Sequence, residues 1–145
     1  MVTLIGFGNH MKNKSLIKDY LTRATHRLAA TELLMTRRSY PDVVRESQEL
    51  VELCLKSILR ANNIEVPRLH DVSDLLLQYK QNLSSDLKPH VSQLVKISRY
   101  LRRDRELAFY GSEDLTPSEF YREEDAKEAL EYARWVLSVC QPLLK

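Results

Sequence analysis

The fold class is decided by residues 41–61, with the sequence PDVVRESQELVELCLKSILRA. Apolar residues recur there in pairs, Val43/Val44, Leu50/Val51, Cys54/Leu55 and Ile58/Leu59, and small Ser47 stands between the first two, so that successive positions of the stripe are three or four residues apart. Because an α-helix has about 3.6 residues per turn, this spacing places the pairs on one face of a helix. Charged residues lie on the opposite face, so the stretch predicts a long amphipathic helix that buries one side.

Working outward from this helix, four further segments show helical periodicity, at about residues 12–37, 71–81, 86–109 and 117–143. Capping and turn residues separate them: Pro41 after Ser39, Asn62-Asn63, and the capping-box spacing of Thr116 and Glu119. We expect the last helix to bury Phe120 with the apolar residues that follow it. The pattern predicts an all-α fold, an up-and-down antiparallel helical bundle whose second and fourth helices pack together, with an extra short helix in a crossover.

The composition limits the class of protein. The chain has 145 residues, so we expect residues 1–11 to form an N-terminal extension and residues 12–145 a single domain. Its 3 glycines supply too little turn chemistry for an all-β fold, and they form no glycine-rich phosphate loop. The net charge of +2 does not by itself predict binding to nucleic acid.

The cysteines and the apolar runs bear on location and cofactors. Cys54 and Cys140 lie in apolar periodic stretches, which predicts buried free thiols in a reducing cytoplasm. No apolar run approaches the roughly 18 residues of a membrane span, so no membrane is expected as a partner. The histidines and cysteines lack metal-ligand spacing, and the sequence predicts neither a metal site nor a cofactor.

Arg105 is the most informative single residue for function. It falls on the inward seam of the fourth predicted helix, which otherwise consists of Leu87, Val91, Leu94, Ser98, Leu101 and Ala108. A buried guanidinium without a partner is costly, so Arg105 needs a carboxylate or a ligand anion. Glu49 and Glu52 of the second helix are the candidate partners. Three alternatives stay open: a structural ion pair, an anion site between helices, or a solvent-facing Arg105 if the seam is one position off.

A basic run surrounds Arg105, with tyrosines among the arginines: Lys96, Arg99, Tyr100, Arg102, Arg103 and Tyr110. Basic residues interleaved with aromatic rings can hold phosphates and stack bases. The same charges are also favourable near a helix C-terminus and can simply face water. On the first interpretation, Arg102, Arg105 and Tyr110 bind a nucleotide or RNA.

Five ordered motifs give the chain a resemblance to a known family: YPDVVR at 40–45, LVELCLKSIL at 50–59, VPRLHDV at 66–72, LRRDRELAFYG at 101–111, and the segment 117–133. Together they resemble the HEPN domain (higher eukaryotes and prokaryotes nucleotide-binding). The resemblance covers about residues 12–143. It implies a helical bundle that usually forms dimers.

The resemblance also implies a function. Many HEPN proteins are ribonucleases, often toxins controlled by a nucleotidyltransferase partner, and they cleave RNA without a metal through an Arg-x4-6-His motif. Arg105 matches the arginine of that motif, but Tyr110 stands where the histidine is expected. A free phenol titrates at about 10 and is a poor general base at neutral pH.

Two functions therefore remain. The favoured one is a homodimeric binding module that holds a nucleotide, an RNA or a nucleotidyltransferase partner, with Glu49 and Glu52 as supporting residues. The alternative is a metal-independent ribonuclease in which Arg105 and Tyr110 are catalytic.

Overall fold

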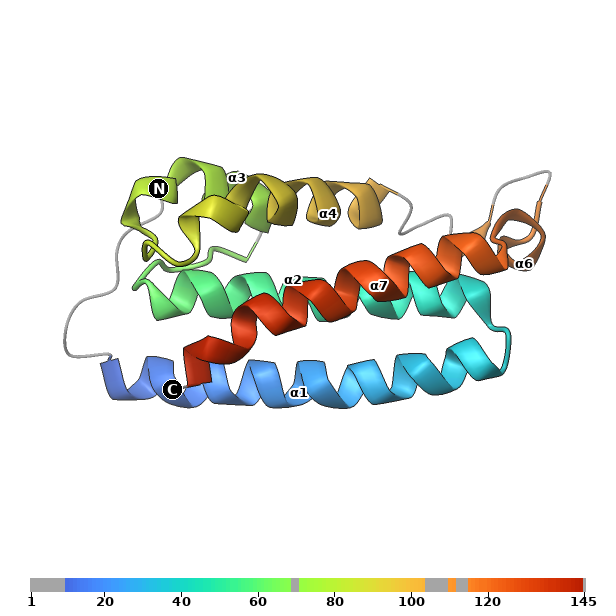
Figure 1. Ribbon diagram of the computed structural model, residues 1–145, viewed down its shortest axis with the longest axis horizontal. Coiled ribbons are helices and arrows are strands. Elements are labelled where there is room, and N and C mark those ends of the chain that lie inside the picture. The colour runs from blue at the N-terminus through green and yellow to red at the C-terminus, as the bar shows by residue number, and fades with distance from the viewer. Residues whose placement is uncertain (1–9, 69–70, 104–109, 112–114, 145) are drawn as a thin grey trace.

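The computed structural model describes residues 10–68, 71–103, 110–111 and 115–144, with side chains from Asn13 onward. Within these residues the regular elements are all helical, and the fold is an antiparallel bundle (Figure 1). The long helices are α1 (His10–Thr36), α2 (Tyr40–Ala61), α4 (Val91–Arg103) and α7 (Glu123–Cys140). Shorter helices are α3 (Val72–Gln78) and α6 (Pro117–Phe120), with 3-10 turns η2 (Lys80–Asn82), η3 (Lys88–His90) and η4 (Gln141–Leu144).

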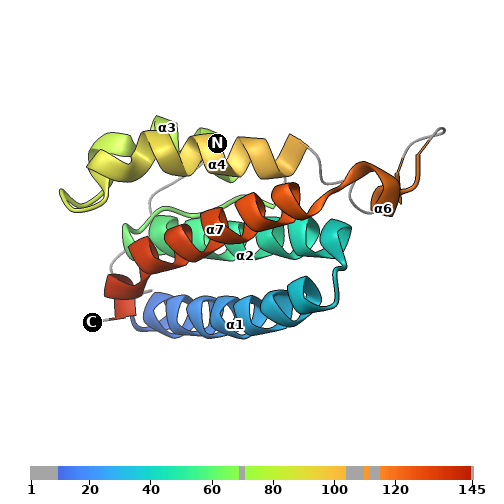
Figure 2. The same cartoon turned by 45° about the vertical axis from the view of Figure 1, so that its right-hand side comes forward.

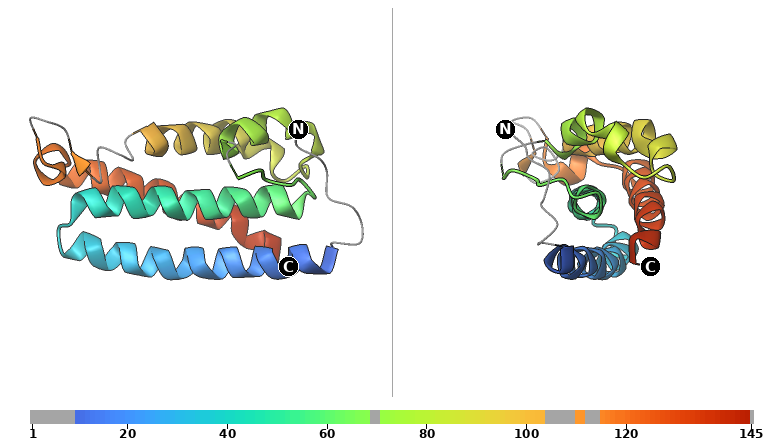
Figure 3. Two further views of the ribbon diagram at one scale, coloured as in Figure 1. Left: turned by 180° about the vertical axis from the view of Figure 1, so that it is seen from behind. Right: turned by 90° about the vertical axis from the view of Figure 1, so that its left-hand side faces the viewer.

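Helix α2 is the centre of the bundle. Figure 2 shows α7 crossing beside it, and the end-on view in Figure 3 shows α1, α7 and the α3–α4 layer arranged around it. It packs against α1, α7, α4 and α3. This position explains the sequence of α2, because its residues that point toward the surrounding helices must be apolar or small.

The predicted core is confirmed. Val51, Leu55 and Leu101 are each about fully buried, so α2 and α4 pack together as expected. The described part of the α4 seam is also buried: Leu87, Val91, Leu94, Ser98 and Leu101. Cys54 and Cys140 are buried free thiols, and the Cys140 thiol lies 3.5 Å from the Cys54 carbonyl oxygen.

The boundaries of the first three helices follow local signals. Tyr40–Ala61 differs by one residue from the predicted 41–61, with Pro41 in its first turn, and Asn63 ends it with φ 59, a left-handed conformation that Asn tolerates. Asp71 caps α3 as a side-chain acceptor for the Ser73 backbone N–H at 2.9 Å. The third helix is shorter than predicted, because the chain tightens into η2 after Gln78.

Two predictions about the later helices are wrong. The fourth helix begins at Val91 rather than near residue 86, after the 3-10 turn that contains Pro89; its predicted end at 104–109 lies outside the described residues. The predicted last helix is broken: α6 ends at Phe120, the next two residues are extended, and α7 starts at Glu123. The break reverses the expected burial, since Phe120 is 42% exposed and Tyr121 is buried instead.

Candidate functional site

The candidate site lies where α4 ends, close to the start of α7 (Figure 1). Of its predicted residues, Arg105 lies outside the described part of the chain. Tyr110 is described and is 76% exposed to solvent. The remaining predicted residues, Arg102, Glu49 and Glu52, lie on α4 and α2.

Arg102 is held by carboxylates from two other helices. Its guanidinium lies 3.6 Å from the Glu52 carboxylate on α2 and 3.4 Å from the Asp71 carboxylate at the start of α3. Asp71 also accepts the cap hydrogen bonds from Ser73, so its position is fixed. The three side chains are partly exposed, so each ion pair contributes only about 0.2–1 kcal/mol. Their main effect is to orient Arg102, and the trio carries one net negative charge.

Glu52, predicted as a candidate partner of Arg105, pairs with Arg102 among the described residues. It belongs to a row of carboxylates on α2, spaced three residues apart: Glu46, Glu49 and Glu52. Arg27 of α1 donates a 2.8 Å hydrogen bond to Glu46 at one end of the row, and Arg102 pairs with Glu52 at the other. Half-buried Glu49 lies between these pairs. The row thus joins α2 to α1 and α4 through opposite charges.

Arg103, the next residue of α4, lies over an aromatic ring. Its guanidinium carbon lies 5.2 Å from the centroid of the Tyr100 ring, within cation–π distance. Tyr100 in turn meets Tyr132 of α7 edge to face, with ring centroids 5.7 Å apart. Burial, with the Glu128 carboxylate nearby, raises the pKa of Tyr132, so this phenol stays protonated and neutral beside Tyr100.

A small pocket opens beside these rings, with a volume of about 150 Å³. We call it the aromatic pocket; its lining residues are Val44, Tyr100, Leu101, Arg103, Phe120, Tyr121, Asp125 and Ala129. Exposed Phe120 packs edge to face on buried Tyr121, with centroids 4.9 Å apart. Asp125 accepts the Arg122 backbone N–H on Oδ2 at 2.8 Å, and within the described chain its Oδ1 accepts no hydrogen bond.

Gly111, the residue after Tyr110, lies close to the start of α6. Gly111 has φ +80, and a Cβ added to it would lie 2.7 Å from the Leu115 carbonyl oxygen and 2.8 Å from Pro117 Cδ. Only glycine fits this approach without strain. The α6 helix that follows is locked by a reciprocal capping box between Thr116 and Glu119.

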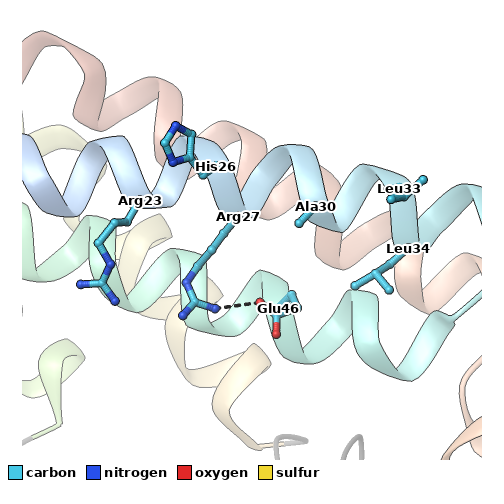
Figure 4. Close-up of a pocket in the computed structure, with 7 residues that line it drawn as sticks. All are labelled: Arg23, His26, Arg27, Ala30, Leu33, Leu34 and Glu46. Atoms are coloured by element: carbon cyan, nitrogen blue, oxygen red, sulfur yellow. Dashed lines mark hydrogen bonds and ion pairs between the residues drawn. The ribbon is translucent and has the colours of Figure 1, made fainter.

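A second hollow, of about 590 Å³, lies along α1 beside α2 (Figure 4). Arg23, Arg27 and Leu34 point toward α2, whereas His26 points away from it. Its basic character is partly cancelled, because Arg27 pairs with Glu46 and Arg23 lies 3.7 Å from Asp19. We assign no ligand to it.

Two classes of feature are absent from the described part of the chain, a metal-binding cluster and a membrane-spanning helix. No group of three or more His, Cys, Asp or Glu side chains that could hold a metal occurs among the residues with described placement. In that same part of the chain, no helix is long and apolar enough to cross a membrane.

Two features of the site are absent from the sequence-based expectations. Asp71 pairs with Arg102 of another helix. Phe120, expected in the core, lines the aromatic pocket together with Asp125. The available signal for a second helix start is the acidic run Glu123-Glu124-Asp125, which is typical of a first helical turn.

Comparisons with known proteins agree with this architecture. The sequence profile described as "HEPN domain" matches residues 17–143. A protein of Methanocaldococcus jannaschii named "Putative toxin MJ1304" is 30% identical over 139 residues, which cover 92% of this chain and 91% of the relative. No solved structure matches the chain. An all-helical bundle, a profile match along almost the entire chain and a full-length relative lead to one conclusion: the chain belongs to the HEPN domain family.

Proposed function

We propose that this protein is a homodimeric HEPN binding module that holds the phosphate of an RNA or nucleotide at the end of α4. The observation that supports the proposal is the fixed end of α4, where Arg102 is held against Glu52 and Asp71 and the next residue, Arg103, lies over Tyr100. Guanidinium groups bind phosphate through directed N–H donors, and orienting them in advance lowers the entropy cost of binding.

Within this site the arginines have different tasks. Arg102 has two carboxylates within 4 Å, so it offers an incoming phosphate little net positive charge. It acts mainly as a positioning residue that fixes the end of α4 against α2 and α3. Arg105 lies three residues after Arg102 in the sequence. It is the phosphate-binding arginine of the proposal, as the family motif implies, and Tyr110 follows it five residues later.

The protein partner in this proposal is a nucleotidyltransferase, as in two-gene toxin–antitoxin modules. The toxin name of the M. jannaschii relative supports a toxin-like module. We expect the partner to cover the α4 end, because a partner that blocks the phosphate site would control it directly. Co-expression with a neighbouring nucleotidyltransferase, followed by pull-down, tests this association.

The alternative is a metal-independent ribonuclease, which the toxin name of the relative also favours. In that mechanism Arg105 stabilises the extra negative charge on the phosphorane-like transition state. Tyr110 replaces histidine as the proton-transfer group in this alternative, and the exposure of its side chain supports that role because an RNA can reach it.

One experiment separates the two functions. Purified protein is titrated into fluorescently labelled RNA with and without EDTA, anisotropy reports binding, and a denaturing gel reports cleavage. The variant is Arg105→Ala, and the matched control is Arg134→Ala, an exposed α7 arginine paired with Glu32. The binding module predicts loss of binding in Arg105→Ala alone, with intact RNA throughout.

Other outcomes are equally clear. Cleavage that persists in EDTA and disappears in both Arg105→Ala and Tyr110→Phe establishes the ribonuclease. Equal RNA binding by Arg105→Ala and the wild type refutes the site assignment.

A further inference from the structure

We propose that the aromatic pocket is a subsite for one nucleobase, and that it selects bases carrying an exocyclic amino group over uracil. This inference rests on the proposed function, because it supplies the base-recognition element beside the phosphate site. It goes beyond that function by naming the ligand chemistry and the residues that choose it.

The size of the pocket fits one base. Its volume of about 150 Å³ is about five times a water molecule's share of liquid volume. That space accepts a single ring system and is too small for two stacked nucleotides. The floor is apolar, formed by Val44, Leu101 and Ala129, so a planar base can displace water from it.

The walls provide a stacking surface. Phe120 is exposed, yet it is not mobile in the way of a loop residue, because α6 is closed by its capping box and the ring leans on buried Tyr121. A rigid exposed aromatic ring stacks on a base at low entropy cost, and such stacking tolerates any base. Phe120 therefore contributes affinity rather than selectivity.

Selectivity comes from Asp125. Its Oδ2 is occupied by the Arg122 backbone N–H, while Oδ1 accepts no hydrogen bond from the described residues. A carboxylate oxygen accepts from the amino groups of cytosine, adenine or guanine, and it repels the carbonyl oxygen that uracil presents at the equivalent position. The half-buried location of Asp125 strengthens this discrimination.

The aromatic pocket also lies close to the proposed phosphate site at the end of α4. Arg103 lines it and belongs to the same turn of α4 as Arg102, so a nucleotide whose base enters the pocket has its phosphate near the arginines. The competing explanation of an exposed Phe120 is contact with a second copy of this chain. A protein contact explains the exposed ring, and the α7 cap explains one oxygen of Asp125, but a ring and a hydrogen-bond acceptor lining the same pocket together favour a base.

The test uses labelled homopolymers of adenosine, cytidine and uridine of equal length, with anisotropy as the measurement. Wild-type protein should bind the adenosine and cytidine polymers more tightly than the uridine polymer. Phe120→Leu, which keeps apolar bulk without a stacking ring, should weaken binding of all three by about tenfold. The matched control is Leu77→Ala, since Leu77 is 45% exposed on α3, outside the pocket, and should change nothing.

Asp125→Asn is the decisive variant. Asparagine keeps an oxygen for the Arg122 N–H, so α7 should stay capped, but its amide can donate to the uracil carbonyl. The preference should therefore shift toward the uridine polymer by about tenfold, which one good hydrogen-bond difference allows. Thermal melts of each variant verify that the bundle is folded.

Failures of the subsite and of the proposed function are distinguishable. If wild-type protein binds no homopolymer, the proposed function fails, and the subsite with it. If wild-type protein binds but Phe120→Leu and Asp125→Asn bind identically to it, the subsite alone is refuted. If Phe120→Leu halves the particle mass in light scattering, the ring belongs to a protein interface, and the subsite is again refuted.

Discussion

Replacing Gly111 by alanine tests whether the turn at Gly111 positions the candidate site. Gly111 adopts φ +80, a conformation that costs an L-residue about 1–2 kcal/mol. The new Cβ would also meet the Leu115 carbonyl oxygen at 2.7 Å and Pro117 Cδ at 2.8 Å. Both neighbours are rigid, since one is backbone and the other a proline ring, so the chain itself must shift.

The size of the effect follows from these two contributions. Overpacking costs typically about 1–3 kcal/mol, so Gly111→Ala should lower the free energy of unfolding by about 2–5 kcal/mol if the turn unfolds with the bundle. If the turn instead opens on its own, the global loss is limited to the free energy of that opening. The Tyr121 amide, which donates to the Pro117 carbonyl at 2.9 Å, should then exchange with solvent faster.

Urea unfolding followed by circular dichroism measures the loss of global stability, and hydrogen exchange measures local opening of the turn. Gly111→Asn serves as the companion variant, because asparagine tolerates positive φ better than alanine while keeping the Cβ clash. It should therefore lose less stability than Gly111→Ala. Unchanged stability and unchanged exchange in Gly111→Ala would show that the turn does not have the described geometry.

Three further predictions concern the core and assembly. Leu55→Ala should cost about 2–5 kcal/mol in urea unfolding because Leu55 is fully buried, whereas Leu33→Ala, at a side chain 59% exposed, should cost under about 0.5 kcal/mol. A hydrogen bond to Cys54 and burial raise the pKa of the Cys140 thiol, so the native state holds this proton more tightly. The free energy of unfolding should fall as pH rises above the unfolded thiol pKa of about 8.5, and urea titrations of Cys140→Ala should show a shallower decline. Light scattering at micromolar concentration should give twice the chain mass of 17.0 kDa, and a mass near 17.0 kDa would contradict the homodimer.

The sequence predicted the long helices because their signals are local. The apolar pairs of 41–61 and the proline and asparagines at its ends define α2 almost to the residue. The seam of α4 was likewise readable, since four- and three-residue spacing fixes which side faces inward. These features depend on neighbours a few positions apart, which a single sequence contains.

The break in the last predicted helix depends on tertiary packing. Phe120 and Tyr121 are adjacent aromatic residues with similar burial preference, and periodicity alone assigned Phe120 to the core. In the structure α6 ends between the two rings, and the start of α7 turns Tyr121 inward. The choice depends on where α7 must begin to pack along α2, which local spacing does not specify.

The sequence indicates which helices carry the candidate site, but it does not indicate which of their side chains form ion pairs. The sequence predicts Glu49 or Glu52 as a partner of Arg105, which lies outside the described residues, and the described partner of Glu52 is Arg102. The Asp71 contact was invisible in the sequence, because it requires the α3 N-terminus to be folded back over α4. Pairing between helices is set by their relative register, which packing determines.

The division of charge around α2 explains why the number of arginines is a poor guide to ligand binding. Arg27 and Arg102 each lie against a carboxylate of the α2 row, so they join helices and leave little net attraction for phosphate. Arg103 instead lies over the Tyr100 ring and lines the aromatic pocket. Under the proposed function, an incoming nucleotide would meet an aromatic wall there and not a uniformly basic helix. On that proposal, base contacts at Phe120 and Asp125 supply a larger share of the affinity than overall charge, which is consistent with a net charge of only +2.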